Sequence, residues 1–243
     1  MHGFSNCSGV KADRELSVGK TVLLFFACLI TGFTHAQTDW TVSFSPMIEQ
    51  QPLELNQTYI LKNDTFRIET LRFYLSNVSF LNEGKTVFTE PESFHLVDAE
   101  DSMSYRIAFH SPKNVVFDEI QFNVGIDSTT NVAGVMGGDL DPTKGMYWSW
   151  QSGYINFKLE GWNPKSTARK HEFQYHLGGY MAPYSALSTV RIPCGKAKSA
   201  TVITVQLAAF LNQLNVVELP AIMSPSERAA ILSQSIPSMF SAK

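Results

Sequence analysis

Two stretches decide the fold, VFDEIQFNV at residues 116–124 and YINFKLE at residues 154–160. In the first, every second residue from Val116 to Val124 is apolar except Asp118. In the second, the apolar residues Ile155, Phe157 and Leu159 alternate with polar or amphipathic ones. A period of two places one face of a strand in the core and the other in solvent, as in antiparallel sheets.

Similar segments recur along the chain with turn signals between them. The predicted strands are Trp40–Ser45, Thr65–Leu81, Thr86–Asp98, Tyr105–Phe109, Val115–Val124, Tyr147–Glu160, Lys170–Gly178, Ser188–Ile192 and Thr201–Leu207. One helix is predicted near the end, with Ser224 as its cap, Pro225 at its first position and residues 228–234 helical. We therefore expect an all-β chain, an antiparallel β-sandwich of immunoglobulin-like or related type with a short C-terminal helix.

The composition bounds the function. The chain has 243 residues, of which 44% are hydrophobic and 17% charged, so it can bury a core and is not intrinsically disordered. The formal net charge is −3, and no block of like charge occurs. A nucleic-acid-binding protein needs a basic face to neutralise phosphates, and we therefore exclude that class.

The N-terminal region has the pattern of a secretory signal. Lys20 precedes the apolar run of residues 21–33, and the small-x-small sequence Thr34-His35-Ala36 follows. The run is too short to span a bilayer as a helix. We expect a signal peptide at residues 1–36, cleaved near Ala36, and one domain at residues 37–243. The mature protein is then periplasmic, secreted or at the cell surface of a bacterium, without a transmembrane segment.

Cysteine usage agrees with a domain that is held together by its core. Cleavage would remove Cys7 and Cys28 and leave Cys194, so no internal disulfide can form. The alternative to cleavage at Ala36 is lipidation of Cys28. In the chain cleaved at Ala36, Cys194 is buried, linked to a second chain or bound to metal.

Two histidines are the first candidates for chemistry. His95 lies in FHLVD and His176 in FQYHLG, and each avoids the obvious apolar face of its strand. If the two strands are neighbours, both imidazoles can bind one metal ion, with Glu172 orienting one of them. The alternative is that each histidine only forms hydrogen bonds at the sheet surface.

Aromatic and acidic residues supply further candidates. Trp148 and Trp150 share the polar side of their strand, where they can stack on sugars or mark an interface. A bulge near residues 152–153 would instead turn both rings into the core. The glycine-rich stretch of residues 127–145 is either a functional loop or a mobile surface loop. Its three carboxylates can bind calcium or cap turns: Asp127, Asp139 and Asp141.

Motifs for catalysis are missing from the sequence. It has no GxSxG elbow, haem-attachment CxxCH, P-loop or dinucleotide fingerprint. The residues alone thus predict an exported β-rich domain that binds a ligand or a metal and is not an enzyme.

Several segments together carry a family resemblance. The longest is GMYWSWQSGYINFKLEG at residues 145–161, and the others are LRFYLSNVSF, FHLVDAED, FNVGIDSTTNVAG, GGDLDP and FQYHLGG. The chain resembles the MbnP-like family, which includes copper-binding proteins of the MbnP, MopE and CorA type. The resemblance implies an exported β-sandwich. In the copper-binding members, two histidines and a tryptophan oxidised to kynurenine hold the copper.

The residues that match the family's histidines are His95 and His176, but Ser93 stands where the family tryptophan would precede the first of them. Kynurenine cannot form at residue 93. Three alternatives follow: weaker copper binding, substitution by Trp148 or Trp150, or a different function. Met103, Met146 or Met181 can add a soft thioether ligand. A di-haem peroxidase-like protein or a copper transporter is the partner that the resemblance implies.

Two functions are therefore expected to compete. The first is an exported protein that sequesters or delivers copper through a two-histidine site. The second is a cell-surface or periplasmic module that recognises a glycan or a protein through exposed tryptophans and the 127–145 loop.

Overall fold

The computed structural model describes residues 37–62, 64–112, 115–148, 153–196 and 200–242. The predicted signal peptide, with Cys7 and Cys28, lies outside the described residues, and so does Trp150. Among the described residues, no helix is both long enough and apolar enough to cross a membrane.

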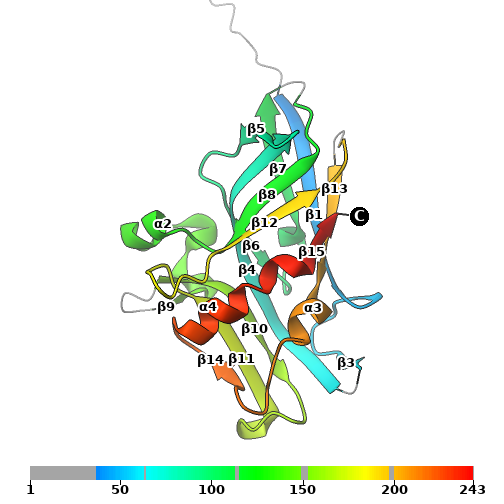
Figure 1. The fold of residues 1–243 in the computed structure, drawn as a ribbon, viewed down its shortest axis with the longest axis vertical. Coiled ribbons are helices and arrows are strands. Elements are labelled where there is room, and N and C mark those ends of the chain that lie inside the picture. The colour runs from blue at the N-terminus through cyan, green and yellow to red at the C-terminus, as the bar shows by residue number, and fades with distance from the viewer. Residues whose placement is uncertain (1–36, 63, 113–114, 149–152, 197–199, 243) are drawn as a thin grey trace, which may run out of the picture. The chain divides into compact units, whose positions relative to one another are not determined.

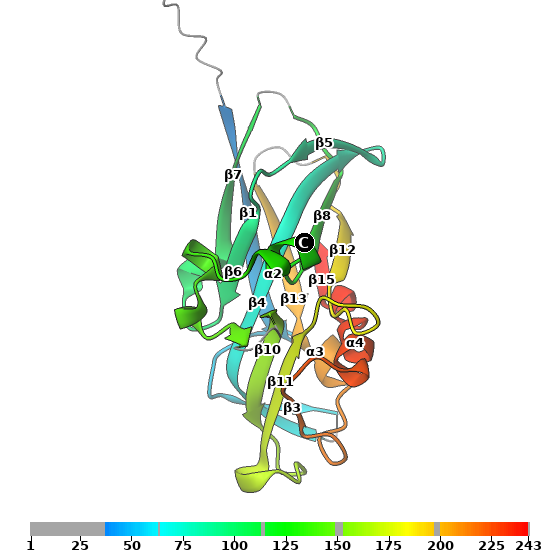
Figure 2. The same ribbon diagram turned by 90° about the vertical axis from the view of Figure 1, so that its left-hand side faces the viewer.

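Strands form two sheets (Figures 1 and 2). The first sheet contains β15 (Phe240–Ala242), β13 (Ala200–Gln206), β1 (Gln37–Ile48) and β2 (Gln51–Pro52) in that order, with β7 (Arg106–Pro112) also paired to β1. The second has the order β12 (Ser188–Pro193), β8 (Glu119–Val124), β4 (Asp64–Asn82), β10 (Gly153–Trp162), β11 (Glu172–Gly178) and β14 (Ala221–Ile222). Three short strands pair with β4: β3 (Thr58–Leu61), β5 (Lys85–Thr89) and β6 (Phe94–Asp98). One more, β9 (Tyr147–Trp148), pairs with β10.

The main core lies between the two sheets. Phe44 of β1 contacts Phe73 of β4 and Phe122 of β8, with ring centroids 6.4 and 5.9 Å apart. The residues that alternate in the sequence supply this layer, including the fully buried Phe157 and Leu159. The all-β sandwich expected from the alternation is therefore confirmed.

β4 organises the second sheet. Its 19 residues pair with β10 and then β8 along one edge, and with β3, β6 and β5 along the other. The register shifts between Ser76 and Ser79, where Asn77 has a φ of 53°. Ser93 satisfies a backbone group inside this irregularity, because its Oγ accepts a hydrogen bond from the Val78 N–H at 3.0 Å.

The 127–145 segment builds a second, smaller core on the outer face of the second sheet. It contains helix α2 (Ser128–Ala133) and the short turns η2 (Gly138–Leu140) and η3 (Pro142–Lys144). Leu140 and Met146 pack there with Tyr74, Leu96 and Tyr154, all of them buried. The structure thus gives this stretch its own helical turns and a packing role, which sequence periodicity did not show.

Two further details differ from the expectation. β1 pairs with β13, and β11 with β14, in parallel, so the sheets are mixed and not purely antiparallel. The C-terminal helix α4 (Glu227–Ser233) forms as predicted, but its cap is Ser226, whose Oγ accepts the Ala229 N–H at 3.2 Å, and not Ser224. Helix α3 (Leu207–Leu211) and the turns η1 (Ser102–Tyr105), η4 (Arg169–His171) and η5 (Ile236–Met239) complete the fold.

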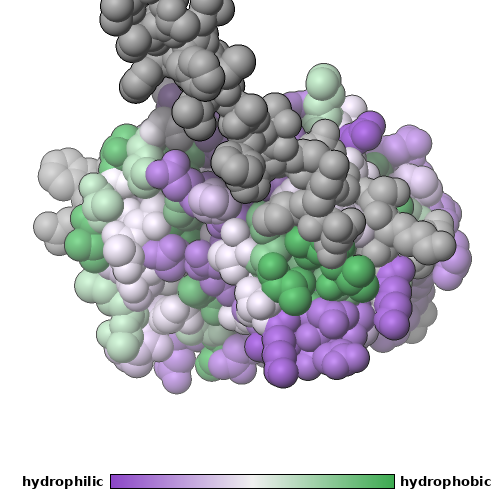
Figure 3. Space-filling view, turned by 90° about the horizontal axis from the view of Figure 1, so that it is seen from above, coloured by the Kyte–Doolittle hydropathy of each residue, from purple (hydrophilic) through white to green (hydrophobic). Residues whose placement is uncertain are grey.

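An apolar area lies next to hydrophilic side chains in the view from above (Figure 3). Exposed apolar side chains are otherwise scattered, among them Val87 of β5 and Val202 of β13. Single exposed apolar residues are normal for a folded protein and mark no site by themselves.

Candidate metal-binding site

His95 lies on the inner face of the second sheet, at its edge. It pairs with Leu75 of β4 and therefore shares the side of Leu75 that faces the core. Its ring contacts Phe109 of β7, with the centroids 5.7 Å apart, and 22% of its side chain is exposed. The expectation that His95 avoids the core face is wrong, because β6 is covered on both faces.

A carboxylate orients the His95 ring. Nε2 lies 2.8 Å from Oε2 of Glu90, in the loop between β5 and β6. A carboxylate only accepts hydrogen bonds, so Nε2 carries the proton and Nδ1 of the neutral ring keeps a lone pair. Metal-binding histidines are commonly held by a carboxylate in this way.

His176 lies on the outer face, as predicted. It pairs with Lys158 of β10, and only 7% of its side chain is exposed. Its Nε2 donates to Oε1 of Glu160 at 2.6 Å, and this bond holds the pKa of Glu160 at about 2. The ammonium of Lys158 lies 3.6 Å from the same carboxylate oxygen and adds to the shift. The nearby ammonium of Lys158 repels a metal cation and so disfavours metal binding at His176.

The structure does not bring the two histidines together. β4 and β10 lie between β6 and β11, so three strand spacings separate His95 from His176. That is about 14 Å across the sheet. The side chains also point to opposite faces. His95 aligns with Leu75 of β4, and His176 aligns with Arg72 of β4 through Lys158 of β10. These two positions on β4 are an odd number of residues apart, and successive side chains of a strand point to opposite faces. One ion cannot contact both imidazoles in this arrangement, which corrects the expectation of a shared site.

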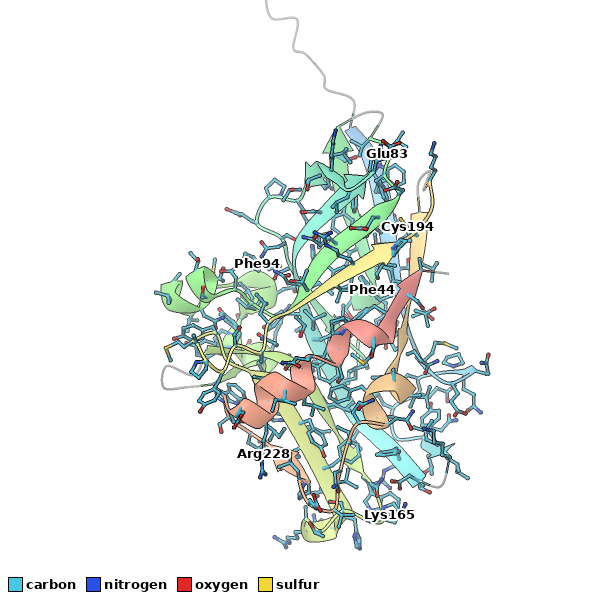
Figure 4. The ribbon with its side chains drawn as sticks, in the orientation of Figure 1. Phe44, Glu83, Phe94, Lys165, Cys194 and Arg228 are labelled. Carbon is cyan, nitrogen blue, oxygen red and sulfur yellow. The ribbon has the colours of Figure 1, made fainter. Side chains whose placement is uncertain are left out.

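His95 instead shares a cavity with Met103. The cavity has a volume of about 580 Å³ and lies beside β6, η1 and the start of β7. Met103 is 82% exposed. The charged residues of the lining are Arg72, Arg106, Lys144, Asp98, Asp101 and Asp139. Figure 4 labels Phe94, the residue before His95, beside the α2 segment.

Side chains seal the edge of β6 that faces away from β4. Oδ2 of Asp139 accepts the Leu96 N–H at 3.0 Å, and Oγ of Ser104 accepts the Asp98 N–H at 2.9 Å. Arg72 reaches over β6, with Nε 2.8 Å from Asp98 and Nη2 2.8 Å from Glu100. These bonds fix the cavity wall next to His95.

Ser93 has a structural role beside this cavity. It is 4% exposed and bonds to β4, as described above. Its side chain is therefore committed to the irregularity in β4. An indole at this position would lose that hydrogen bond and would not fit the buried space.

Trp148 lies on the outer face and not beside His95. Its half-buried ring lies against Gly178 of β11, where an added Cβ would meet the ring at 2.7 Å. Gly178 is two residues from His176, so the structure places Trp148 on the His176 side of the sheet. The register of β10 shifts between Ile155 and Phe157 against β11 and between Glu160 and Gly161 against β4, and neither shift falls at Gly153.

The three carboxylates of the 127–145 segment all have hydrogen-bond partners within the protein. Asp127 caps α2 through the Thr130 N–H at 2.8 Å, and Asp139 bonds to Leu96 and Lys144. Hydrogen bonds from the Thr143 hydroxyl and N–H lower the pKa of Asp141. In the described part of the chain, no group of three or more His, Cys, Asp or Glu residues is arranged to hold a metal ion.

Sequence reasoning missed Glu90 and Glu160 as partners of the histidines. Glu160 is 16 residues from His176 and reaches it only across the β10–β11 pair. Cys194 is half-buried against the main core, and burial raises the pKa of its thiol.

Comparisons with known proteins agree with this fold. The family described as MbnP matches residues 37–224. The solved structure of MbnP from Methylosinus trichosporium aligns with a TM-score of 0.59 and 13% identity, covering 85% of this chain and 98% of that one. No curated protein matches. At that identity the structural likeness shows the fold alone.

Proposed function

Because the chain belongs to the MbnP family, we propose that it is an exported copper-binding protein that sequesters or delivers the metal and is not an enzyme. The observation that carries this proposal is the cavity that His95 and Met103 share. An imidazole with a free Nδ1 and a thioether are donors that suit copper.

The fit of the residues to copper supports His95 and not a two-histidine site. Nε2 of His95 is held by Glu90, the ring borders an open cavity, and a soft ligand lines the same space. His176 has a comparable carboxylate partner, but it is nearly buried and lies across from Lys158. We therefore assign the copper to His95 and Met103, with Glu90 as the positioning residue.

Export is part of the proposal. The family match begins at residue 37, immediately after the predicted cleavage at Ala36. This agreement supports a mature chain that starts at Gln37 in the periplasm or at the cell surface. A copper donor or acceptor in the same compartment is the partner class that this role needs.

The test is a titration of the protein, purified from periplasm, with Cu(I) and Cu(II) in the presence of a competing chelator. We expect one copper per chain and loss of that copper in His95→Ala. Glu90→Gln should lower the affinity about 10- to 100-fold, as for other residues that orient a ligand. Met103→Leu should weaken Cu(I) more than Cu(II), because the thioether is a soft ligand.

His176→Ala is the matched control, since it removes an imidazole with the same kind of carboxylate partner. Its copper affinity should equal that of the unmodified protein, with circular dichroism confirming that every variant is folded. Unchanged affinity in His95→Ala would overturn the assignment. Loss in His176→Ala alone would move the site to the outer face beside Trp148.

A further inference from the structure

A second cavity lies beside the C-terminal helix α4. It has a volume of about 440 Å³ and lies between α4, the chain that follows α3, and Tyr175 of β11. It shares no lining residue with the cavity beside His95. Figure 4 labels Arg228 at the start of α4, on the side of β14 and β11. Volumes of this size are typical of small-molecule sites.

Apolar side chains form much of the cavity wall. Leu214, Leu219 and Leu232 are half-buried, and Ile231 at the rim is 59% exposed. Tyr175 contributes its ring only, because its hydroxyl donates to the carbonyl of Leu219 at 2.6 Å. This wall offers apolar surface that a ligand side chain can cover, which is favourable in water.

Two opposite charges border the same cavity. Arg228 comes from α4 and Glu218 from the segment after α3, and both residues are exposed. Neither side chain forms a salt bridge with any residue in the described part of the chain, and they do not pair with each other. An unpaired guanidinium favours a carboxylate, and an unpaired carboxylate favours an ammonium group.

We propose that this cavity binds a free α-amino acid with an apolar side chain. The α-carboxylate pairs with Arg228, the α-ammonium pairs with Glu218, and the side chain lies against Leu214, Leu219 and Ile231. Gln213, Asn215 and Ser235 also line the cavity and offer neutral hydrogen-bonding groups. An uncharged apolar ligand would leave both charges unused, and a simple anion or cation would use one of them. The proposal does not depend on copper binding.

Isothermal titration calorimetry with three related probes tests the proposal on the intact protein. L-phenylalanine carries both charges, 3-phenylpropionate lacks the ammonium, and phenethylamine lacks the carboxylate. We expect saturable binding of one phenylalanine per chain with a dissociation constant below about 1 mM. Each of the other two probes should bind about two- to fivefold more weakly, because one ion pair with an exposed side chain is lost.

Variants locate the binding. Arg228→Ala should weaken phenylalanine and 3-phenylpropionate but leave phenethylamine unchanged, and Glu218→Ala should do the reverse with the two singly charged probes. The exposed Arg169 and Glu54 lie outside the cavity, so Arg169→Ala and Glu54→Ala are the matched controls. Absence of saturable phenylalanine binding would overturn the proposal. Equal binding of all three probes, or affinity unaffected by both cavity variants, would overturn it as well.

Discussion

At the scale of single residues, two histidine–glutamate pairs mark the two faces of the second sheet. His95 pairs with Glu90 on the inner side, and His176 pairs with Glu160 on the outer side. In both pairs the Nε2 proton is directed at a carboxylate, which fixes the tautomer and the ring orientation. The same kind of histidine–carboxylate pair thus occurs in two environments, beside an open cavity for His95 and on a nearly buried sheet surface for His176.

The His176–Glu160 pair predicts a dependence of stability on pH. Folding lowers the pKa of Glu160 from 4.5 to about 2, mainly through the hydrogen bond from His176. A carboxyl with a lowered pKa stabilises the fold fully above pH 4.5, and this contribution is lost as the pH falls towards 2. Glu160→Gln should lower the free energy of unfolding by about 1–3 kcal/mol at neutral pH. The difference from the unmodified protein should shrink at acidic pH.

Urea unfolding at neutral pH and near pH 3 measures this difference. Glu172 lies on β11, the strand of His176, and forms no salt bridge within the described chain, so Glu172→Gln is the control and should show little change at either pH. A Glu160→Gln effect of the same size at both pH values would contradict the assignment of the lowered pKa to this pair.

At the scale of elements, short helices depend on their caps. α4 has seven residues, and such a helix is marginal without capping and packing. The sequence SPSE offers two serines as caps, and a proline directly after the first favours Ser224. The structure selects Ser226, whose backbone is extended and whose Oγ accepts the Ala229 N–H, so α4 begins at Glu227.

A pair of serine variants tests this choice. Ser226→Ala should lower the free energy of unfolding by about 1 kcal/mol, because the Ala229 N–H loses its acceptor. Ser224→Ala should change it by less than about 0.5 kcal/mol, since Ser224 is exposed. Chemical denaturation of the two variants side by side gives both values. A larger effect at Ser224 would mean that the helix begins two residues earlier.

At the scale of the whole domain, the last strand helps to join the two sheets. β15 pairs with β13 of the first sheet, and its Phe240 contacts Phe73 and Phe122 of the second sheet. The centroid distances are 5.8 and 5.3 Å, and Phe240 is 8% exposed. The C-terminal residues therefore complete the core that begins with β1.

Removal of this ring should weaken the whole domain. Phe240→Ala should lower the free energy of unfolding by about 3–5 kcal/mol, because it leaves a cavity between the sheets. Ile60→Ala, at a position that is 74% exposed, should change it by less than about 0.5 kcal/mol. Thermal and urea unfolding compare the two variants. Similar small effects for both would show that β15 adds little to the core.

Local patterns in the sequence predicted the strands well. Alternation identified β4, β12 and β13 to within one residue at each end, because a half-buried strand must place an apolar side chain at every second position. It began β8 four residues early, and it merged β5 with β6 and β9 with β10 into single strands. The same reasoning missed β14 and the helical turns of residues 128–144. These elements are too short for a periodic signal. Leu140 of η2 is stabilised by packing with Tyr74 and Leu96, and Ile222 of β14 packs in the main core.

The candidate site was predicted only in part. His95, Met103 and His176 were all identified by their donor chemistry, but the pairing of the two histidines was wrong. Glu90 and the Arg72–Asp98 pair belong to the site through contacts across strands and loops. No spacing along the chain encodes such contacts.

The sequence by itself determined that the chain folds as an all-β sandwich with a short C-terminal helix, since the alternation of apolar residues is a local property. It also determined the donors that are available for a metal. The tertiary structure alone decided the faces and neighbours of these donors. Alternation shows which residues of one strand share a side, but strand order and register decide which side meets the core. That order puts β4 and β10 between His95 and His176, and it places His95 beside Met103.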